Sequence, residues 1–544
     1  MNRDEIKRRF GYFPTPQLHT DLAHQYVSEV FGSDWKEKFV VWDCCCGTGN
    51  LTKDYKFREL YLSTIKQDEL DFVLESSYNP GAIKFQFDFL NDSDDKLPQG
   101  LRDAINNGKD ILFLLNPPYA EATNMKTDRG TGKHKTGVAK TLMNEEMAKQ
   151  KWGRSSSNLY GQFLYRIWKY QEVNKNIRIG LFCNSRYLTG SGYKTFRERF
   201  FKRFDYKKGF LFQASHFSGV SAKWGISFAV YDNQVNKAED FKHDLFELKD
   251  GKLLEKGEKV IYNVDRVTTL SKWVREPIKK MKTFDTPQLT SALKVKSEGC
   301  LRGSLVEDAL GYMLLAANDV GNNANNVCLL TSAYSGGNGL SVVIENFDRV
   351  CTTFTARKSI KGNWINDTDE YSSPNIEHTE YNQFEIDSIV YLLFNNSSEQ
   401  SSLRQVTYKD KKYDIKNEFF WMSRKEMMEL ADIERVAFDE DAKMDKDRFV
   451  YKRLFVDGVY NQLSPDARAV LDKASDLVRK SIKERNLMSI EHPGYHLSSW
   501  DAGFAQLKLV WKVYFKEEFE KFRELYSKLE QRLIPLVYEL GFLK

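Results

Sequence analysis

Short strand-like segments that alternate with longer stretches restrict the fold of this chain more than any other feature. Four of them lie in the first 240 residues, at Phe39–Asp43, Ile111–Leu115, Ile177–Cys183 and Ile226–Tyr231. Strands of this length, separated by helix-length connections, are typical of parallel sheets, because parallel strands need long crossovers. The spacing predicts an α/β domain over residues 1–240 with a largely parallel sheet.

The pattern changes after about residue 240. The alternation stops, and runs rich in Asn and Gly at 322–326 and 335–339 indicate loops. From Phe515 to Leu533, apolar residues recur every three or four positions, which predicts one apolar helix face. We expect this face to pack on its own chain, with a dimer seam as the alternative. The sequence thus predicts three parts: 1–240, an irregular α+β domain over 241–500, and a helical segment over 501–544.

Bulk composition limits the function without identifying a partner. Hydrophobic residues make up 41%, enough for more than one core, and 81 Lys and Arg against 76 Asp and Glu leave a net charge of +5. Such a small excess does not identify a nucleic-acid binder, so local clusters must carry that argument. No apolar run reaches the ~20 residues that span a bilayer, and the N-terminal residues lack a signal-peptide core. We expect a soluble, cytoplasmic protein with no membrane partner.

The cysteines and histidines do not form a metal-binding pattern. Among seven cysteines there is no C-x-x-C pair, and Cys44–Cys46 lie on one extended segment that cannot direct three thiols at one tetrahedral ion. His492 and His496 are four residues apart, but Pro493 and Gly494 break any helix that would align them. The sequence predicts no metal site.

An acidic residue and two glycines follow the first predicted strand. Asp43 ends that strand and is followed directly by Cys44-Cys45-Cys46-Gly47-Thr48-Gly49-Asn50. Glycine lets the backbone approach a ligand closely, and nucleoside ligands bind at this edge of open α/β sheets. The loop is not a Walker phosphate cradle, because no G-K-[ST] is present. An acid before the loop suits a ligand that carries a cationic amino acid, such as S-adenosylmethionine, and a tight structural turn is the alternative.

Further acidic residues fall near two other strand ends. Either Asp68 or Glu69 follows the second strand, where a carboxylate commonly accepts hydrogen bonds from ribose hydroxyls. The strand end is not defined well enough to choose between them. Asp88 lies near the end of the predicted strand Phe85–Phe89, where an acid accepts a hydrogen bond from an adenine amino group and Phe89 packs against the ring.

The tetrapeptide Asn116-Pro117-Pro118-Tyr119 directly follows the strand Ile111–Leu115. Two prolines fix φ and remove two N–H donors, so the turn presents mainly acceptors, the Asn116 side-chain oxygen and the Pro117 carbonyl. Two fixed acceptors match a planar NH2 group and direct its nitrogen lone pair at an electrophile. Tyr119 offers a flat face on which the base that bears the amine stacks. The sequence predicts a catalytic turn at the same sheet edge as the glycine loop, with a purely structural turn as the alternative.

Together these motifs resemble the DNA adenine-N6 methyltransferases whose motif order runs from cofactor loop to catalytic turn to a C-terminal target-recognition domain. The resemblance covers roughly the first 240 residues and also includes Phe13-Pro14-Thr15-Pro16, Phe87-Asp88-Phe89 and Asn158–Phe163. It implies a Rossmann-like, S-adenosylmethionine-dependent methyltransferase sheet with helices on both faces, followed by a target-recognition domain over 241–500. The acidic residue after the second strand lies later than the group's pattern, which leaves the ribose contact open.

The resemblance also implies roles for individual residues. It implies a catalytic role for Asn116, Pro117, Pro118 and Tyr119, and it places Phe217, with Trp224 in reserve, against a flipped target adenine. The implied reaction is a direct SN2 transfer of a methyl group to N6, without a metal or a covalent nucleophile. The implied cofactor-binding residues are Phe13, Thr15, Pro16, Asp43, Gly47, Thr48, Gly49, Asn50, Asp68 or Glu69, Asp88, Phe89 and Asn116.

Local positive charge supplies the DNA-binding candidates. The segment between the catalytic turn and Asn158 carries eight Lys and Arg, including Lys133 and Lys135, and we expect it to order on DNA. In the C-terminal half, Arg357, Lys358, Lys361 and Trp364 combine residue types that suit phosphate and base-edge contacts. The expected partner is double-stranded DNA. We expect a monomer or weak homodimer that acts as a restriction-modification or orphan enzyme, with any cognate restriction endonuclease in a separate chain.

Other functions share parts of this pattern. An RNA adenine-N6 methyltransferase uses the same chemistry, although such enzymes are usually smaller. A protein glutamine-N5 methyltransferase uses Asn-Pro-Pro-Tyr on a side-chain amide, but resembles shorter chains with an N-terminal helical domain. A fused nuclease would need a P-D…E-x-K motif, and the sequence contains no convincing one. A catalytically dead DNA-binding module is not expected to keep Asn116 and both glycines. The RNA enzyme is the first alternative.

Overall fold

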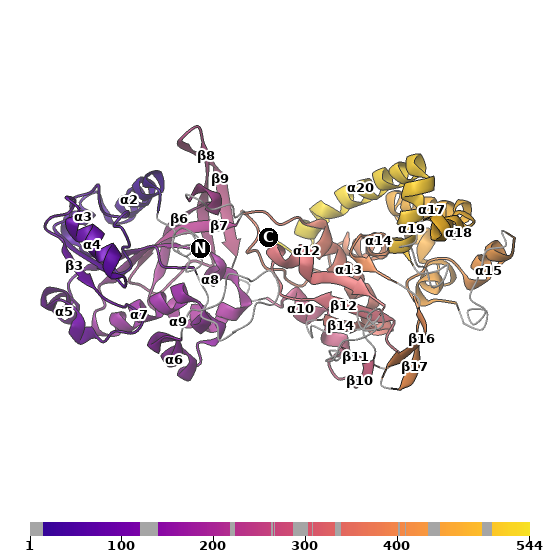
Figure 1. The fold of residues 1–544 in the computed structure, drawn as a ribbon, viewed down its shortest axis with the longest axis horizontal. Coiled ribbons are helices and arrows are strands. Elements are labelled where there is room, and N and C mark those ends of the chain that lie inside the picture. The colour runs from indigo at the N-terminus through magenta and orange to yellow at the C-terminus, as the bar shows by residue number, and fades with distance from the viewer. Residues whose placement is uncertain are drawn as a thin grey trace. The chain divides into compact units, whose positions relative to one another are not determined.

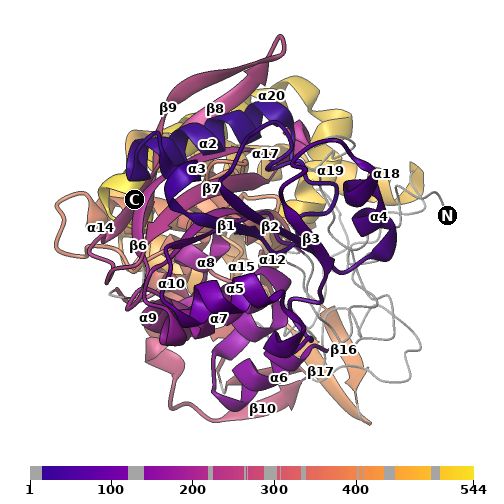
Figure 2. The ribbon, with the colours of Figure 1, turned by 90° about the vertical axis from the view of Figure 1, so that its left-hand side faces the viewer.

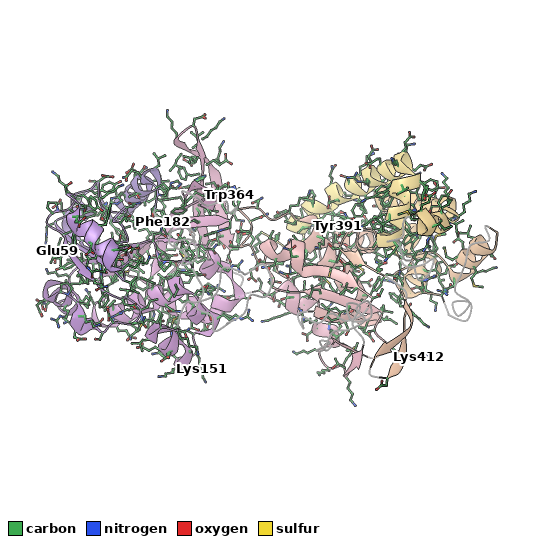
Figure 3. All side chains as sticks on the ribbon, in the orientation of Figure 1. Glu59, Lys151, Phe182, Trp364, Tyr391 and Lys412 are labelled. Atoms are coloured by element: carbon green, nitrogen blue, oxygen red, sulfur yellow. The ribbon has the colours of Figure 1, made fainter. Side chains whose placement is uncertain are left out.

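The chain folds into two compact units, which the computed structural model describes over residues 15–119, 140–217, 224–262, 265, 267–286, 303–306, 308–331, 339–400, 403–408, 410–433, 447–491 and 503–544. Unit 1 comprises Met1–Arg266 together with the returning segment Asn363–Asp369, and unit 2 comprises Val267–Gly362 and Glu370–Lys544. Figure 3 labels Phe182 in unit 1 and Tyr391 in unit 2, both fully buried in the cores of their units. Within the described ranges, no helix is long and apolar enough to cross a membrane.

Unit 1 is built on a sheet with the strand order β3-β2-β1-β4-β5-β7-β6-β8-β9. Neighbours from β3 to β5 are parallel, and β7 runs antiparallel to both β5 and β6. The strands are β1 (Val40–Asp43), β2 (Glu59–Thr64), β3 (Ile83–Gln86), β4 (Ile111–Leu115), β5 (Ile177–Cys183), β6 (Asp205–Gln213), β7 (Gly225–Asp232), β8 (Asp240–Lys249) and β9 (Lys252–Tyr262).

Helices cover both faces of this sheet, as Figure 2 shows. In β4 the side chains of Ile111, Phe113 and Leu115 enter one core and those of Leu112 and Leu114 enter the other, all fully buried. A strand that is apolar at every position is what a sheet covered on both faces requires. The first core includes α5 (Gln99–Asn106), α7 (Leu159–Val173) and α9 (Lys194–Phe200), and the second includes α2 (Gln17–Phe31), α3 (Trp35–Lys38) and α4 (Gln67–Glu75). The predicted Rossmann-like α/β class is confirmed.

The order of the strands defines where a ligand binds. From β1 the chain moves outward through β2 and β3 on one side, then returns to continue through β4 and β5 on the other. The point of reversal therefore lies between β1 and β4, and in open α/β sheets the carboxyl ends of the strands at such a point form the ligand site.

The boundary of unit 1 differs from the predicted residue 240. The hairpin of β8 and β9 continues the sheet, with β8 parallel to β6, so that unit 1 extends to Arg266. In Figure 1 this hairpin projects from the rest of unit 1. The polar, alternating sequence of these strands hides them from a search for buried apolar segments.

Unit 2 combines a four-stranded sheet of order β14-β12-β13-β15 with helices. Phe519, Phe522, Leu529 and Leu533 on α20 lie in its core, so the predicted apolar face packs on its own chain and the segment 501–544 belongs to this unit. The strands are β12 (Gly311–Leu315), β13 (Val327–Leu330), β14 (Gly339–Val342) and β15 (Ser398–Glu399), beside the hairpins β10 (Thr283–Thr286) with β11 (Gly303–Val306) and β16 (Leu403–Tyr408) with β17 (Lys411–Ile415). The longer helices are α13 (Phe347–Ser359), α14 (Tyr381–Leu393), α15 (Arg424–Ile433), α17 (Pro465–Lys480), α19 (Phe504–Tyr514) and α20 (Lys516–Glu539).

Candidate active site

Asp43 ends β1 as a buried carboxylate, 1% exposed. One of its oxygens, Oδ1, accepts a hydrogen bond from the Cys45 N–H at 3.2 Å, while Oδ2 has no hydrogen-bond partner among the described residues. Burial raises the pKa of Asp43 to about 7, and the Cys45 N–H opposes this only in part. A buried carboxylate oxygen without a donor is costly, so this atom suits a ligand that brings a donor or a positive charge.

The backbone after Asp43 turns through two glycines with positive φ, +51° at Gly47 and +79° at Gly49. The Tyr78 hydroxyl donates to the Thr48 carbonyl oxygen and holds the turn from outside. A Cβ added to Gly49 would come within 3.0 Å of the Tyr78 ring, so both conformation and space require glycine at this position. The loop therefore turns tightly beside Asp43, and both glycines are buried in it.

The second predicted site lies at the neighbouring strand end. Since β1 and β4 are parallel neighbours, Asn116 after β4 and Asp43 at the end of β1 share one sheet edge at the reversal of strand order. Asn116 Nδ2 donates to Thr15 Oγ1 at 2.9 Å, and Asn50 Nδ2 donates to the Thr15 carbonyl oxygen at 3.3 Å. Thr15, just before Pro16 and α2, thereby joins the glycine loop to the catalytic turn. Sequence spacing alone could not reveal a contact across 101 residues.

The aromatic residues near the turn are arranged differently from the prediction. The Tyr119 hydroxyl donates to Asn116 Oδ1 at 2.5 Å, and the Tyr119 ring meets the Trp224 ring edge to face at 5.6 Å. Both rings are partly buried. Phe217, the first candidate for the contact with a target base, is 1% exposed and packs on Phe212 at 5.7 Å. The structure thus brings Trp224, the reserve candidate, to the catalytic turn and places Phe217 in the core.

Asp68 and Glu69 lie in the first turn of α4, beyond the end of β2 at Thr64. Glu69 is buried, and its carboxylate accepts hydrogen bonds from Thr64 Oγ1 at 2.7 Å and Lys66 Nζ at 3.0 Å. Asp68 is exposed and accepts a hydrogen bond from the Glu69 N–H at 3.1 Å. Only Glu69 is therefore held against the strand end, which distinguishes two residues that the sequence left equivalent.

Asp88 and Phe89 follow β3, which ends at Gln86 rather than at Phe89. The Asp88 carboxylate accepts hydrogen bonds from the Leu90 N–H at 3.0 Å and from Asn91 Nδ2 at 2.7 Å. Phe89 is 2% exposed and stacks on Phe163 at 5.0 Å. Phe89 therefore belongs to the hydrophobic core, while Asp88 remains partly exposed at the sheet edge.

Arg166 on α7 is a supporting residue that the sequence reading missed. Arg166 is only 5% exposed. Its guanidinium donates to the Phe89 and Asp92 carbonyl oxygens at 2.6 and 2.7 Å and to Asp94 Oδ1 at 2.6 Å. These bonds fix the segment that carries Asp88. The signal was present in the sequence as one arginine on an otherwise apolar helix face, and such a residue needs partners.

The predicted substrate-contact residues are scattered. Phe13, Lys133 and Lys135 lie outside the described residues. Arg357 is fully buried on α13, and its guanidinium is hydrogen-bonded within unit 2, which does not support the predicted DNA contact. Lys358 is partly buried and Lys361 exposed. Trp364, labelled in Figure 3, belongs to the segment that returns to unit 1, where its carbonyl oxygen lies against Gly225, the residue after Trp224.

No group of three or more His, Cys, Asp or Glu in the described part of the chain is arranged to hold a metal ion. The site offers two hydrogen-bond acceptors, the buried Asp43 carboxylate and the amide oxygen of Asn116, and the Tyr119–Trp224 aromatic pair lies beside Asn116.

Comparison with known proteins gives matches at the level of structure alone. No protein-family model matches the sequence, and no curated protein matches it. Solved structures that are similar include the methyltransferase subunit of a type I restriction-modification system from Streptococcus thermophilus, with 16% identity over 45% of this chain and 50% of that one, at a TM-score of 0.31. The DrdV–DNA complex matches with 11% identity over 59% and 36% at 0.35, and the type IIG restriction endonuclease BpuSI with 13% over 55% and 38% at 0.31. The chain covers at most half the length of these proteins, and at such TM-scores the matches do not establish a shared family.

Proposed function

We propose that this protein is an S-adenosylmethionine-dependent methyltransferase that modifies N6 of an adenine flipped out of double-stranded DNA. One observation carries the proposal: an Asn-Pro-Pro-Tyr turn that presents mainly acceptors and a buried acid followed by a glycine loop end neighbouring parallel strands at the reversal of strand order. Their contact through Thr15 supports a single site rather than two unrelated turns.

The residues at the end of β1 fit the cofactor. The Asp43 Oδ2 atom, which has no partner among the described residues, would accept a hydrogen bond from the cofactor's ammonium group, and the tight turn at Gly47 and Gly49 would bring the loop backbone against the cofactor. Glu69 is the better candidate for the ribose hydroxyls because it is held against β2, and Asp88 is the candidate for the adenine amino group. When bound, the cofactor supplies a methyl group on a sulfonium, which needs no covalent nucleophile from the protein.

The turn after β4 would hold the target amine. Asn116 Oδ1 and the Pro117 carbonyl accept its two hydrogens and orient the nitrogen lone pair. In the structure the Tyr119 hydroxyl donates to that same Asn116 oxygen, so an incoming amine replaces this bond while the Tyr119 ring stacks on the base. Trp224, at 5.6 Å from Tyr119, is the proposed second aromatic contact of the flipped base.

Unit 2 is the proposed target-recognition domain, and the whole chain is proposed to act as a monomer or weak homodimer in restriction-modification or as an orphan enzyme. The test is incubation of the protein with methyl-labelled S-adenosylmethionine and, separately, unmethylated double-stranded DNA, total RNA and a protein extract. Digestion of the labelled product to nucleosides then identifies the modified base. The proposal expects N6-methyldeoxyadenosine from DNA. Label in RNA alone would favour the RNA adenine enzyme, label in protein alone a glutamine-N5 enzyme, and label in a cytosine product would contradict the assignment of the base.

A further inference from the structure

A polar loop in unit 2 is longer and more highly hydrogen-bonded than a connection between two antiparallel strands needs to be. It runs from Asp319 to Asn326, between β12 and β13, and contains four asparagines within five residues, at 322, 323, 325 and 326. A tight hairpin turn would connect the antiparallel strands β12 and β13 with far fewer residues.

Arg357 supports this loop from the core of unit 2. It is fully buried, and its guanidinium donates to the Asn323 side-chain oxygen, to the Ala317 carbonyl at 3.3 Å and to the Asp319 carbonyl at 3.1 Å. All three acceptors are neutral oxygens, and the ring of Tyr371 covers the guanidinium at 4.9 Å. The Asp319 and Glu370 carboxylates favour the charge of Arg357 but accept no hydrogen bond from it, so its burial still costs stability, and its presence indicates that the shape of the loop matters.

Other bonds fix the loop along its length. The Asp319 carboxylate accepts hydrogen bonds from the Asn322 N–H at 3.1 Å and from Asn322 Nδ2 at 2.7 Å, and Asn322 Oδ1 accepts from Asn326 Nδ2 at 2.6 Å. Lys358 Nζ donates to the Asn323 carbonyl at 2.8 Å. Ala317, two residues before the loop, has φ +57°, which is a strained conformation for alanine and is typical of functional sites.

One asparagine is left outside this network. Asn325 is exposed, and in the described part of the chain its side-chain amide makes no hydrogen bond. Two lysines accompany it: Lys358, which is bound to the loop backbone, and the exposed Lys361, whose neighbour Gly362 lies against Val320 and Gly321. The result is an exposed amide, with one donor group and one acceptor, on a loop whose neighbouring residues are fixed by hydrogen bonds, two of them from Lys358.

We propose that Asn325 reads a base edge in the DNA that unit 1 modifies, that Lys361 contacts the adjacent phosphate backbone, and that Arg357 is a positioning residue for the loop. This inference rests on the proposed function and makes it more specific. An asparagine amide presents the donor and acceptor that match N7 and N6 of adenine in the major groove, and lysine provides the charge that neutralises phosphates. A side chain that distinguishes bases must be held in place by the loop that carries it, and the hydrogen bonds of Arg357 and Asp319 hold this loop.

The test compares wild-type protein, Asn325→Ala and a matched control, Asn461→Ala, on plasmid DNA from a host without adenine methylation. Asn461 is also an exposed asparagine of unit 2, in a short helical turn at Val459–Gln462. Sequencing that detects modified bases gives the preferred site of each protein and the ratio of methylation at that site to sites with one mismatch. For Asn325→Ala we expect this ratio to fall roughly tenfold to a hundredfold at one position of the site. We expect cofactor affinity and the rate at saturating DNA to stay within about threefold, and Asn461→Ala to match the wild type.

A second variant tests the positioning role. Arg357→Lys keeps the charge but has fewer donors for three oxygens, so we expect it to relax the same position of the site while the cofactor affinity of unit 1 is unchanged. An unchanged site preference in Asn325→Ala, or an equal loss in Asn461→Ala, overturns the inference while leaving DNA methylation in place. A wild-type protein that methylates no adenine in the plasmid overturns the proposed function and this inference with it.

Discussion

The state of Asp43 makes the proposed cofactor site testable without any assay of catalysis. The carboxylate is buried, one oxygen lacks a partner, and burial raises its pKa from 3.8 to about 7. Replacement by Asn keeps the shape of the side chain and removes the charge. If a cationic group of the cofactor binds this carboxylate, then the cofactor affinity and the stability of the free protein must both respond to pH, and in opposite directions.

The magnitudes follow from the pKa. A shift of about three units corresponds to about 4 kcal/mol lost from the folding free energy when Asp43 is fully ionised, above pH 7. Between about pH 4 and pH 7 the folded protein holds this proton more tightly than the unfolded chain, so the contribution of Asp43 to stability falls as pH rises and is constant above pH 7. Asp43→Asn lacks this dependence. The difference in unfolding free energy, Asp43→Asn minus wild type, should therefore increase by about 3 kcal/mol when the pH is raised from 5 to 8.

The cofactor responds with the opposite sign, because it binds the ionised carboxylate. Its affinity for the wild type should rise about tenfold per pH unit up to about pH 7 and then level off, while Asp43→Asn binds weakly at every pH. Isothermal titration of S-adenosylmethionine between pH 5.5 and 7.5 measures this, a range below the titration of the ligand's own amino group near pH 8. Urea unfolding of both proteins supplies the stability term. Wild-type affinity that does not change with pH, or a variant that binds as the wild type does at pH 7.5, refutes the reasoning.

Three further predictions concern the Asn-Pro-Pro-Tyr turn, the glycine loop and Arg166, which supports the segment around Asp88. Tyr119→Phe keeps the ring and releases the Asn116 oxygen, so kcat/KM on DNA should change by less than about fivefold. Tyr119→Ala loses base stacking, so kcat/KM should fall by about tenfold to a hundredfold. Equal losses of kcat/KM in both variants would contradict stacking. Gly49→Ala places alanine at φ +79° against a ring and should lower the cofactor affinity and stability by about 1–3 kcal/mol. Its control, Gly251→Ala, at φ +72° in open space, should leave cofactor binding unchanged in the same titration. Arg166→Met leaves two buried carbonyls without donors and should cost about 1–3 kcal/mol of unfolding free energy for each, together with cofactor affinity. A stable variant with normal binding would show that the segment around residue 88 keeps its structure without Arg166.

The sequence predicted the strands that are largely apolar and missed more polar ones. Ile111–Leu115 and Ile177–Cys183 were predicted with the bounds that the structure gives, because strands covered on both faces leave few polar positions, of which Arg178 is the one charged example here. Asp240–Lys249 was assigned to the second part of the chain, because fewer than half of the side chains of this strand are buried, those of Phe241, His243, Leu245 and Phe246. Its place in the sheet depends on pairing with β6, which no local pattern encodes.

The same distinction holds for the candidate site. Asp43 and Asn116 could be placed together from the sequence because strand ends of a parallel sheet meet at one edge. The choice of Glu69 over Asp68, and of Trp224 over Phe217 as the neighbour of the catalytic turn, depends on which side chain the tertiary packing buries. A buried cation such as that of Arg357 has the same sequence signature as a DNA contact, and only its partners tell the two apart.

The most direct test of the central claim is the single-turnover rate of methyl transfer to DNA in Asn116→Ala, with Thr15→Val as the control. Thr15→Val removes the hydrogen bond between Thr15 and Asn116 and keeps the amide oxygen. The account predicts that Asn116→Ala binds S-adenosylmethionine within a few-fold of the wild type and transfers its methyl group about a hundredfold to a thousandfold more slowly, while Thr15→Val stays within about tenfold. An Asn116→Ala protein that methylates adenine at nearly the wild-type rate would contradict it.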